Sequence, residues 1–384
     1  MISKNIKEKP IYKFLFILTI ASAVGLQGWR TLFNNFAVEE AGIDGFWVGV
    51  IQSVREVPGF LALLVIYLLL VFKEHNLSRI SVITLGIGVG LTGFFPSNIG
   101  LLFTTLLMSV GFHYFETTNQ SLTLQHFNKK ESAIVMGRFK SISSLANIGI
   151  GLAIWVLSHF IEMKELFLLI GVIVILLALK TVFIDPSDKD LPLQKKKMVL
   201  KRKYWLFYML NLLAGARRQI FVVFAVFLLV EHYSFSIQMI TVLFILNNLV
   251  NYVLAPLIAK AINRFGERKV LSLEYTSLIF IFAGYAFVSS PVIAGVLYVL
   301  DHIFFNFSIA IKTYFQKTGD TEDIAPSMAV SFTINHIAAV VFPLFGGLLW
   351  VVDWRIPFII GAAISLLSLT FVQFIRTDKE NIKE

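Results

Sequence analysis

The sequence contains no cysteine and little charge. None of its 384 residues is Cys, and only 15% are Asp, Glu, Lys or Arg. The absence of cysteine excludes disulfides, thiolate metal ligands and thiol nucleophiles. The shortage of charged residues excludes a soluble globular protein, because such proteins carry about 25% charged residues.

Hydrophobic residues are correspondingly abundant. They make up 57% of the chain, with 37 Phe and 24 Gly, and the mean hydropathy is +0.78. Aromatic residues and glycine are common in membrane spans. The formal net charge of +9 would suggest a nucleic-acid partner in a soluble chain. In this chain we expect membrane lipids and no nucleic acid as partners.

Twelve segments have the length and hydropathy of a transmembrane helix, which needs about 20 predominantly apolar residues. They predict an all-α integral membrane fold with six-helix halves at 1–184 and 204–384, joined by a polar cytoplasmic linker at 185–203. No connection is long enough to fold alone, and no phosphate-binding G-x-x-x-x-G-K-[ST] loop occurs, which excludes an ATPase. The twelve segments are Tyr12–Val38, Phe46–Phe72, Arg79–Phe95, Gly100–His126, Ile134–His159, Lys164–Ile184, Tyr204–Val230, Ile237–Ile262, Val270–Val288, Pro291–Phe315, Ser327–Val352 and Arg355–Ile375.

Lysine and arginine are distributed unequally between the two ends of these segments. If the N-terminus is cytoplasmic, 26 of the 33 basic residues lie on the inner side, two lie outside and five lie within spans. The positive-inside rule then predicts that both termini are cytoplasmic in a multi-pass protein of the cell (inner) membrane. The basic start and Ala21-Ser22-Ala23 imitate a signal peptide, but eleven further spans predict an uncleaved first helix.

An internal repeat relates the two halves. Residues 29–38 of the first segment match residues 217–226 of the seventh, with identities that include Arg30 with Arg218 and Phe36 with Phe224. Charges lie well inside segments 1, 4, 7 and 10, whereas segments 3, 6 and 12 have none in their interiors. Because charge in hydrocarbon is costly, every first helix of three is expected to face a protein interior and every third to face lipid. Parallel repeats of this kind are typical of transporters.

A basic motif connects the eighth and ninth segments. Its Gly266 permits a tight turn, and its basic residues hold the loop at the anionic inner membrane surface. The motif resembles the G-x-x-x-D-R-x-G-R-R-K signature of the major facilitator superfamily, whereas the corresponding loop 73–79 of the first half has lost nearly all of it. The resemblance implies two six-helix halves that rock around a central cavity, with this motif as a cytoplasmic gate. The motif residues are Ala259, Asn263, Arg264, Gly266 and Arg268, with Ala259 and Asn263 replacing the first Gly and the Asp.

Two embedded arginines are candidate substrate ligands. Arg30 shares a helix face with Gln27 and Asn34, and Arg218 shares one with Asn211. A guanidinium binds a carboxylate or phosphate bidentately, which predicts a small organic or phosphorylated anion as substrate. The symmetric arginines are similar to those of the organophosphate/phosphate antiporters, which implies the same substrate class.

Structural roles are the alternatives for the embedded cations. The two candidate arginines could instead pair with Glu56 or Glu116 and only hold the bundle together. Arg217 points away from Arg218, since adjacent helical residues lie about 100° apart, and we expect it to pair with a neighbouring helix or to reach polar surroundings. Lys312 is a further substrate candidate, and snorkelling of its amine to the cytoplasm is the alternative.

Two carboxylates lie beside imidazoles and are candidate proton-coupling sites. Glu116 shares a face of the fourth segment with His113, and Asp301 precedes His302 in the tenth. Burial disfavours a charged carboxyl group, and imidazole titrates near neutral pH. The alternative is that both carboxylates only neutralise embedded arginines. The other polar residues of the spans are expected to form gate or packing contacts through interhelical hydrogen bonds: Arg55, Glu56, Asn247, Asn248, Asn251, Asn335 and His336.

These features predict a secondary active transporter that moves a small organic or phosphorylated anion by alternating access, coupled to protons or to an anion. One alternative is a proton-coupled exporter of amphipathic drugs or lipids, which the abundance of Phe favours. A second is a membrane sensor or scaffold of the same fold that transports nothing. The seven scattered His and the absence of Cys give no metal-binding pattern. We therefore expect no metal, no cofactor and no enzymatic activity. We also expect the protein to be a monomer.

Overall fold

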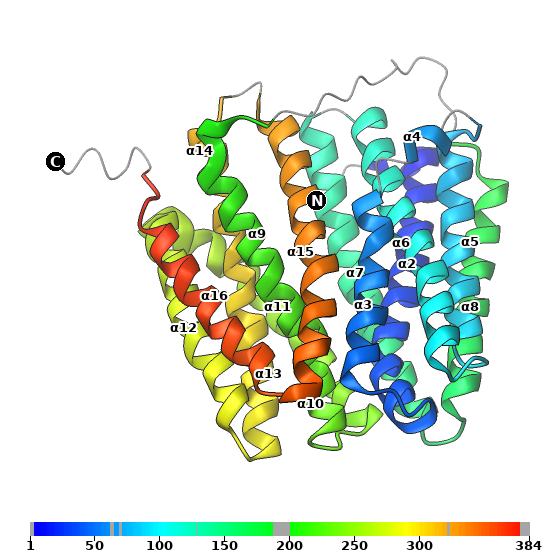
Figure 1. Ribbon diagram of the computed structural model, residues 1–384. Helices are drawn as coiled ribbons and strands as arrows, with labels where there is room; N and C mark the ends of the chain where they lie inside the picture. Colours follow the sequence, from blue (N-terminus) through cyan, green and yellow to red (C-terminus); the bar gives the residue numbers. More distant parts are fainter. Residues whose placement is uncertain are drawn as a thin grey trace. The chain divides into compact units, whose positions relative to one another are not determined.

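The computed structural model describes residues 4–61, 65–68, 71–127, 129–186, 200–320 and 323–376. Within these ranges the chain is helical and has no β-strand, which confirms the all-α class (Figure 1). Most of the predicted linker, including Lys195, Lys196 and Lys197, lies outside the described residues.

The helices follow one another with short connections. Those before the linker are α1 (Lys4–Glu8), α2 (Pro10–Asn35), the π-helical η1 (Phe36–Glu40), α3 (Gly45–Phe60), α4 (Val65–Leu68), α5 (Glu74–Thr92), α6 (Asn98–His126), α7 (Lys129–Leu157), α8 (Met163–Lys180) and the 3₁₀ turn η3 (Thr181–Phe183). Those after it are the 3₁₀ turn η4 (Arg202–Tyr204), α9 (Trp205–Gln219), the π-helical η5 (Ile220–Ala225), α10 (Val226–Glu231), α11 (Ile237–Phe265), α12 (Glu267–Phe287), α13 (Pro291–Phe305), the 3₁₀ turn η6 (Asn306–Ser308), α14 (Ile309–Thr318), α15 (Ile324–Val352) and α16 (Ile356–Val372).

Eleven of the twelve predicted segments coincide with one of these helices or with a run of them, and the second includes α3 and α4 together with 62–64 and 69–70, which lie outside the described residues. Among the described residues, eight helical runs are long and apolar enough to cross a membrane. Shorter apolar helices occupy Ile237–Val250 and Ile356–Val372, and the second predicted segment contains 62–64, outside the described residues. The total of twelve crossings and the cytoplasmic position of the termini therefore stay predictions.

The chain forms two compact units, and the first comprises residues 1–43, 54–194 and 236–248. In this unit α5 packs on both α6 and α8, and α2 packs on α7 and α8. The α5–α8 contact is close, because a Cβ atom on Gly171 would lie 2.5 Å from the carbonyl oxygen of Gly86. Trp29, Phe33 and Phe167 are completely buried in its core.

The second unit comprises residues 44–53, 195–235 and 249–384. Here α9 packs on α15 and α16, and α12 packs on α16 and α13. Phe207 of α9 stacks on Phe315 of α14 with ring centroids 4.0 Å apart, and Tyr275 is buried beside them in the same hydrophobic core. Because α9 continues through η5 into α10, a nearly unbroken helical run from 202 to 231 supports this core.

The helix–helix contacts within each of the two units agree with the predicted repeat. The α2–α7, α2–α8 and α5–α8 contacts of the first unit correspond to the α9–α15, α9–α16 and α12–α16 contacts of the second. Both first helices also continue into a π-helical turn, η1 or η5. Residues 44–53 and 236–248 belong to the unit of the opposite half, and the boundaries 1–184 and 204–384 stay predictions.

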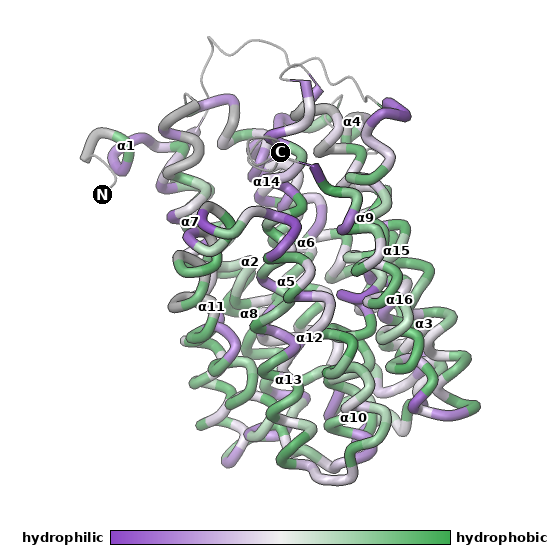
Figure 2. Tube along the Cα trace, turned by 90° about the vertical axis from the view of Figure 1, so that its left-hand side faces the viewer, coloured by the Kyte–Doolittle hydropathy of each residue, from purple (hydrophilic) through white to green (hydrophobic). Residues whose placement is uncertain are grey.

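The helices without interior charge present apolar side chains outward. Hydrophobic positions predominate along the helices (Figure 2). Exposed apolar side chains on a helix that carries no interior charge are what a lipid-facing position requires. The large ones on α5, α8 and α16 are Ile80, Ile87, Leu168, Leu169, Val172, Leu176, Leu179, Ile359, Leu366 and Leu367.

Candidate functional site

Arg218 lies in the last turn of α9, just before the π-helical turn η5. Its side chain is half-buried, and its Nη1 donates to Oδ1 of Asn335 on α15 at 3.3 Å. Nδ2 of Asn335 donates in turn to the backbone carbonyl of Asn211 at 3.5 Å. The predicted face of Arg218 and Asn211 is thus joined to α15, and Asn335 makes the interhelical hydrogen bond expected of it.

The close approach of α9 and α15 positions these groups. A Cβ atom on Gly215 would lie 2.9 Å from Nδ2 of Asn335. Asn211 is buried, and its own Nδ2 donates to the carbonyl oxygen of Phe207. Because Asn335 is neutral, it orients the guanidinium of Arg218 without cancelling its charge. Among the described residues no carboxylate forms an ion pair with Arg218.

Arg217 points to a different part of the second unit. Its Nη2 lies 3.5 Å from Oε1 of Glu274 on α12, and its guanidinium lies over the ring of Tyr275, 4.1 Å from the centroid. Arg217 is 3% exposed and Glu274 is fully buried. The expectation that Arg217 pairs with a neighbouring helix is confirmed. No role was predicted for Glu274, although it is the single charged residue inside the ninth segment.

Asp301 lies inside the second unit on α13. It is 2% exposed and interacts electrostatically with Arg217 and Glu274. The ring of the adjacent His302 contacts Phe221, with centroids 5.9 Å apart. Asp301 thus has charged neighbours from α9 and α12 in addition to His302, which follows it in the sequence.

Lys312 lies on α14, beyond the 3₁₀ turn η6. Its side chain is exposed, whereas Asp301, in the same predicted segment, is buried. A 3₁₀-helix turns by about 120° per residue and an α-helix by about 100°. The three residues of η6 therefore rotate α14 relative to α13, a change that the sequence pattern did not predict.

Arg30 and its predicted partners lie on α2 in the first unit. Gln27 and Asn34 are buried, and Arg30 is half-buried. Nε2 of Gln27 donates to Oγ1 of Thr31 at 3.3 Å. Farther along, Nδ2 of Asn35 donates to a carboxylate oxygen of Glu39 in η1 at 2.7 Å. A π-helical turn follows the embedded arginine in both α2 and α9, and such turns occur frequently at functional sites.

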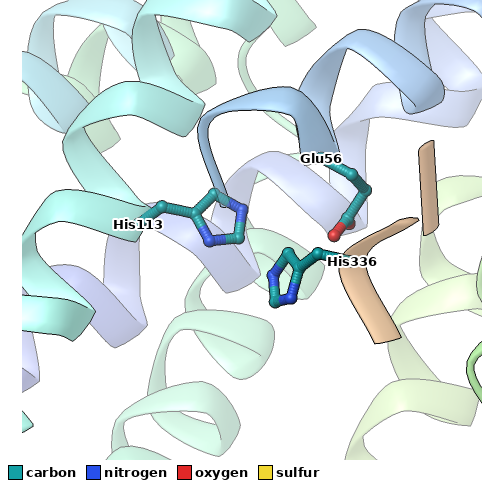
Figure 3. A group of neighbouring side chains, drawn as sticks. All are labelled: Glu56, His113 and His336. Atoms are coloured by element: carbon teal, nitrogen blue, oxygen red, sulfur yellow. The ribbon is translucent and has the colours of Figure 1, made fainter. Parts of the chain in front are cut away.

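A buried ion pair on α3 lies close to His113 of α6. Arg55 Nη2 and Glu56 Oε1 are 2.6 Å apart, and the hydroxyl of Ser109 on α6 donates to the backbone carbonyl of Arg55. A carboxylate oxygen of Glu56 lies within 4.8 Å of a ring nitrogen of His113 (Figure 3). Glu116, the predicted neighbour of His113, has an exposed side chain. The structure thus brings His113 near Glu56, a contact between helices that the spacing along α6 could not predict.

The gating motif forms the connection between α11 and α12. Gly266 has φ 81° and ψ 162°, which confirms the glycine-dependent turn. Arg264 is exposed with its guanidinium over the ring of Phe265, and Arg268 is half-buried. Ala259 and Asn263 belong to α11, but their side chains lie outside the described residues.

Next to the motif, a carboxylate that was not predicted is buried at the start of α12. Glu267 is fully buried, and its Oε1 lies 2.5 Å from Nζ of Lys317 on α14. The family pattern has an arginine at this position, so the acidic residue gave no signal in the sequence. The ion pair attaches the start of α12 to the end of α14.

Comparisons with known proteins identify the fold. A family model described as the Major Facilitator Superfamily matches residues 15–317, and no curated protein matches the chain. A mutant form of the nucleoside transporter NupG is similar with a TM-score of 0.77 at 15% identity, covering 95% of this chain and 99% of that one. A bacterial homologue of the human lysosomal transporter Spinster, in an inward-facing and occupied conformation, has a TM-score of 0.71 at 12% identity, covering 97% of each chain.

Proposed function

The chain belongs to the Major Facilitator Superfamily, and we propose that it is a secondary active transporter that moves a small organic or phosphorylated anion by alternating access. The family and the similar structures point to transport of a small molecule by a multi-pass membrane protein. The substrate class, the coupling ion and the residues below are the finer parts of the proposal.

The contrast between two adjacent arginines supports an anionic substrate. Arg217 is buried and paired with a carboxylate, as expected for a residue that does not contact the substrate. Arg218 is half-buried and hydrogen-bonded to the neutral amide of Asn335. Its positive charge is therefore available to a carboxylate or phosphate, which a guanidinium binds through two parallel hydrogen bonds. This single observation carries the proposal.

The internal repeat extends the proposal to the first half. Arg30 occupies the position equivalent to Arg218 and is also half-buried. We propose that each arginine supplies a guanidinium to the anion, assisted by Asn211 on α9 and by Gln27 and Asn34 on α2. Lys312, whose side chain is exposed, is a further proposed ligand.

We also retain the predicted coupling and gating roles as proposals. The coupling proposal includes His113 with Glu116 on α6, and Asp301 with His302 on α13. The complete burial of Asp301 beside charged neighbours supports its inclusion. In the gating proposal, the turn at Gly266 with Arg264 and Arg268 controls access at the cytoplasmic side.

The test is substrate counterflow in vesicles that contain the purified protein. The probes are inorganic phosphate, a sugar phosphate, a dicarboxylate, a nucleoside and a cationic amphipathic dye. We expect the wild type to exchange at least one anion, and Arg30→Lys and Arg218→Lys to abolish exchange while the protein remains folded. Lysine keeps the charge but loses the bidentate geometry. The matched control is Arg355→Lys, at an exposed arginine before α16, which should exchange normally.

Each other outcome has a definite meaning. Normal anion exchange by both arginine variants would contradict the anion site. Exchange of the cationic dye without any anion would support the drug or lipid exporter instead. No flux for any probe would favour a sensor or scaffold of the same fold, and exchange of the nucleoside alone would extend the activity named for NupG to this chain.

A further inference from the structure

A cluster of charged side chains lies inside the second unit, where α9, α12 and α13 supply one member each. The members are Arg217, Glu274 and Asp301, which are 3%, 0% and 2% exposed. Arg217 and Glu274 form an ion pair at 3.5 Å, and Asp301 interacts electrostatically with both. All three are therefore removed from water together.

The charges in this cluster do not balance. One guanidinium faces two carboxyl groups, so the cluster carries one excess negative charge if both carboxyl groups are ionised. An uncompensated charge is strongly unfavourable in the protein interior and is normally neutralised. Within the described part of the chain, neither oxygen of Glu274 nor Oδ2 of Asp301 has a hydrogen-bond partner. A bound proton removes the excess charge and turns one of these acceptors into a donor.

Among the residues that the structure describes, the surroundings supply no second cation inside the cluster. The titratable groups next to it on α12 and α13 are Tyr275, Tyr285, Tyr298 and His302, whereas α16 has no titratable residue between Ile356 and Val372. The ring of His302 contacts Phe221 of η5. On α14, the side chain of Lys312 is exposed, and the amine of Lys317 pairs with Glu267 at the far end of α12. The two further neighbours carry no Lys or Arg: α10, which packs on α13, ends at Glu231, and α15, which packs on α9, contains His336.

We propose that Glu274 and Asp301 together bind a single proton, and that this proton is the coupling ion of the transporter. The second part rests on the proposed transport function, whereas the first part does not. When the proton is bound, Arg217 faces one net negative charge, and when it leaves, Arg217 faces two. Since Arg217 and Arg218 are consecutive residues of α9, the protonation state changes the force on the helix that carries the proposed anion ligand. The π-helical η5 begins two residues after Arg218 and can accommodate a local rotation of this helix.

Infrared spectroscopy of the purified protein tests the proton site without any substrate. We expect the wild type at neutral pH to show the carbonyl stretch of a protonated buried carboxyl group, which disappears at alkaline pH. In Glu274→Gln and in Asp301→Asn the remaining carboxylate is balanced by Arg217, so both single variants should lose the band. The matched control is Glu267→Gln, which removes a buried carboxylate of α12 that has its own cation, and it should retain the band.

The outcomes separate this inference from the proposed function. A wild type without the band, or a band that persists in both single variants, overturns the shared proton. Stabilisation of a bandless wild type by Na⁺ would assign the excess charge to a metal cation instead. In vesicles, both variants should retain substrate counterflow but lose accumulation driven by a pH gradient. The band with no flux of any probe refutes only the transport function, and flux with no band refutes only the proton site.

Discussion

A single added methyl group tests a close helix contact of the first unit. A Cβ atom on Gly171 of α8 would lie 2.5 Å from the carbonyl oxygen of Gly86 and 2.6 Å from Cα of Gly90, both on α5. Optimal contacts between carbon atoms are about 3.5–4.0 Å. The atoms that the methyl group meets are backbone atoms, which cannot rotate away, so Gly171→Ala must separate α5 and α8 by about 1 Å.

The expected cost follows from two opposing terms. Overpacking of a well-packed interior costs about 1–3 kcal/mol, and the upper part of that range applies because the whole helix pair must move. Replacing glycine by alanine inside a helix returns up to about 1 kcal/mol through the higher helix propensity of alanine. We therefore expect Gly171→Ala to lower the free energy of unfolding by about 1–2 kcal/mol.

The control is Gly149→Ala on α7, where no atom lies within 4 Å of the added Cβ. It has the same propensity gain without the clash and should stabilise the protein slightly. The assay is thermal unfolding in detergent, followed by the fluorescence of the six tryptophans. If Gly171→Ala melts at or above the temperature of Gly149→Ala, α5 and α8 are not packed as closely as described.

Three further predictions concern the ends of helices in the second unit. Lys317→Met leaves the fully buried Glu267 without its cation. This substitution should lower the free energy of unfolding by about 2–3 kcal/mol, which is below the usual range for a buried ion pair because the lysine is partly exposed. In a double-mutant cycle, adding Glu267→Gln should restore most of the lost stability. The ion pair and hydrogen bond from Lys201 hold the pKa of the Asp323 carboxyl below its ordinary value. The resulting stabilisation is complete above about pH 4 and is lost as the pH falls through the lowered pKa, so Asp323→Asn should flatten the acid limb of a melting-temperature profile. Gly266→Ala places a side chain at φ 81° and ψ 162°. In the same melting assay it should lower the free energy of unfolding by about 1–3 kcal/mol.

The fold was largely predictable because it depends on length and hydropathy. Eleven of the twelve predicted segments coincide with a helix or helical run, since about 20 apolar residues suffice to specify a span. The interruptions were not predictable. The π-helical turns η1 and η5 and the 3₁₀ turn η6 contain neither Gly nor Pro, and η5 is wholly apolar. Packing between helices, and not local propensity, determines where such turns occur.

The candidate site was predictable only where a single helix defines it. The divergence of Arg217 and Arg218 follows from the helical repeat, and it was predicted correctly. The contact of His113 with Glu56 joins two helices, and no periodicity along α6 contains that information. Glu274 was overlooked for the same reason, because its significance depends on residues from α9 and α13.

The two units differ in how they balance buried charge, and this difference argues for a proton in the second. In the first unit Arg55 and Glu56 neutralise each other at 2.6 Å within one turn of α3. Such a pair has no net charge when both groups are ionised, so binding a proton would unbalance it. In the second unit one guanidinium serves Glu274 and Asp301, so binding and release of a proton alternate between a balanced and an unbalanced cluster. Coupling requires that these two states act on an element that also binds the substrate, and α9, which carries Arg217 and the proposed anion ligand Arg218, is the candidate for that element.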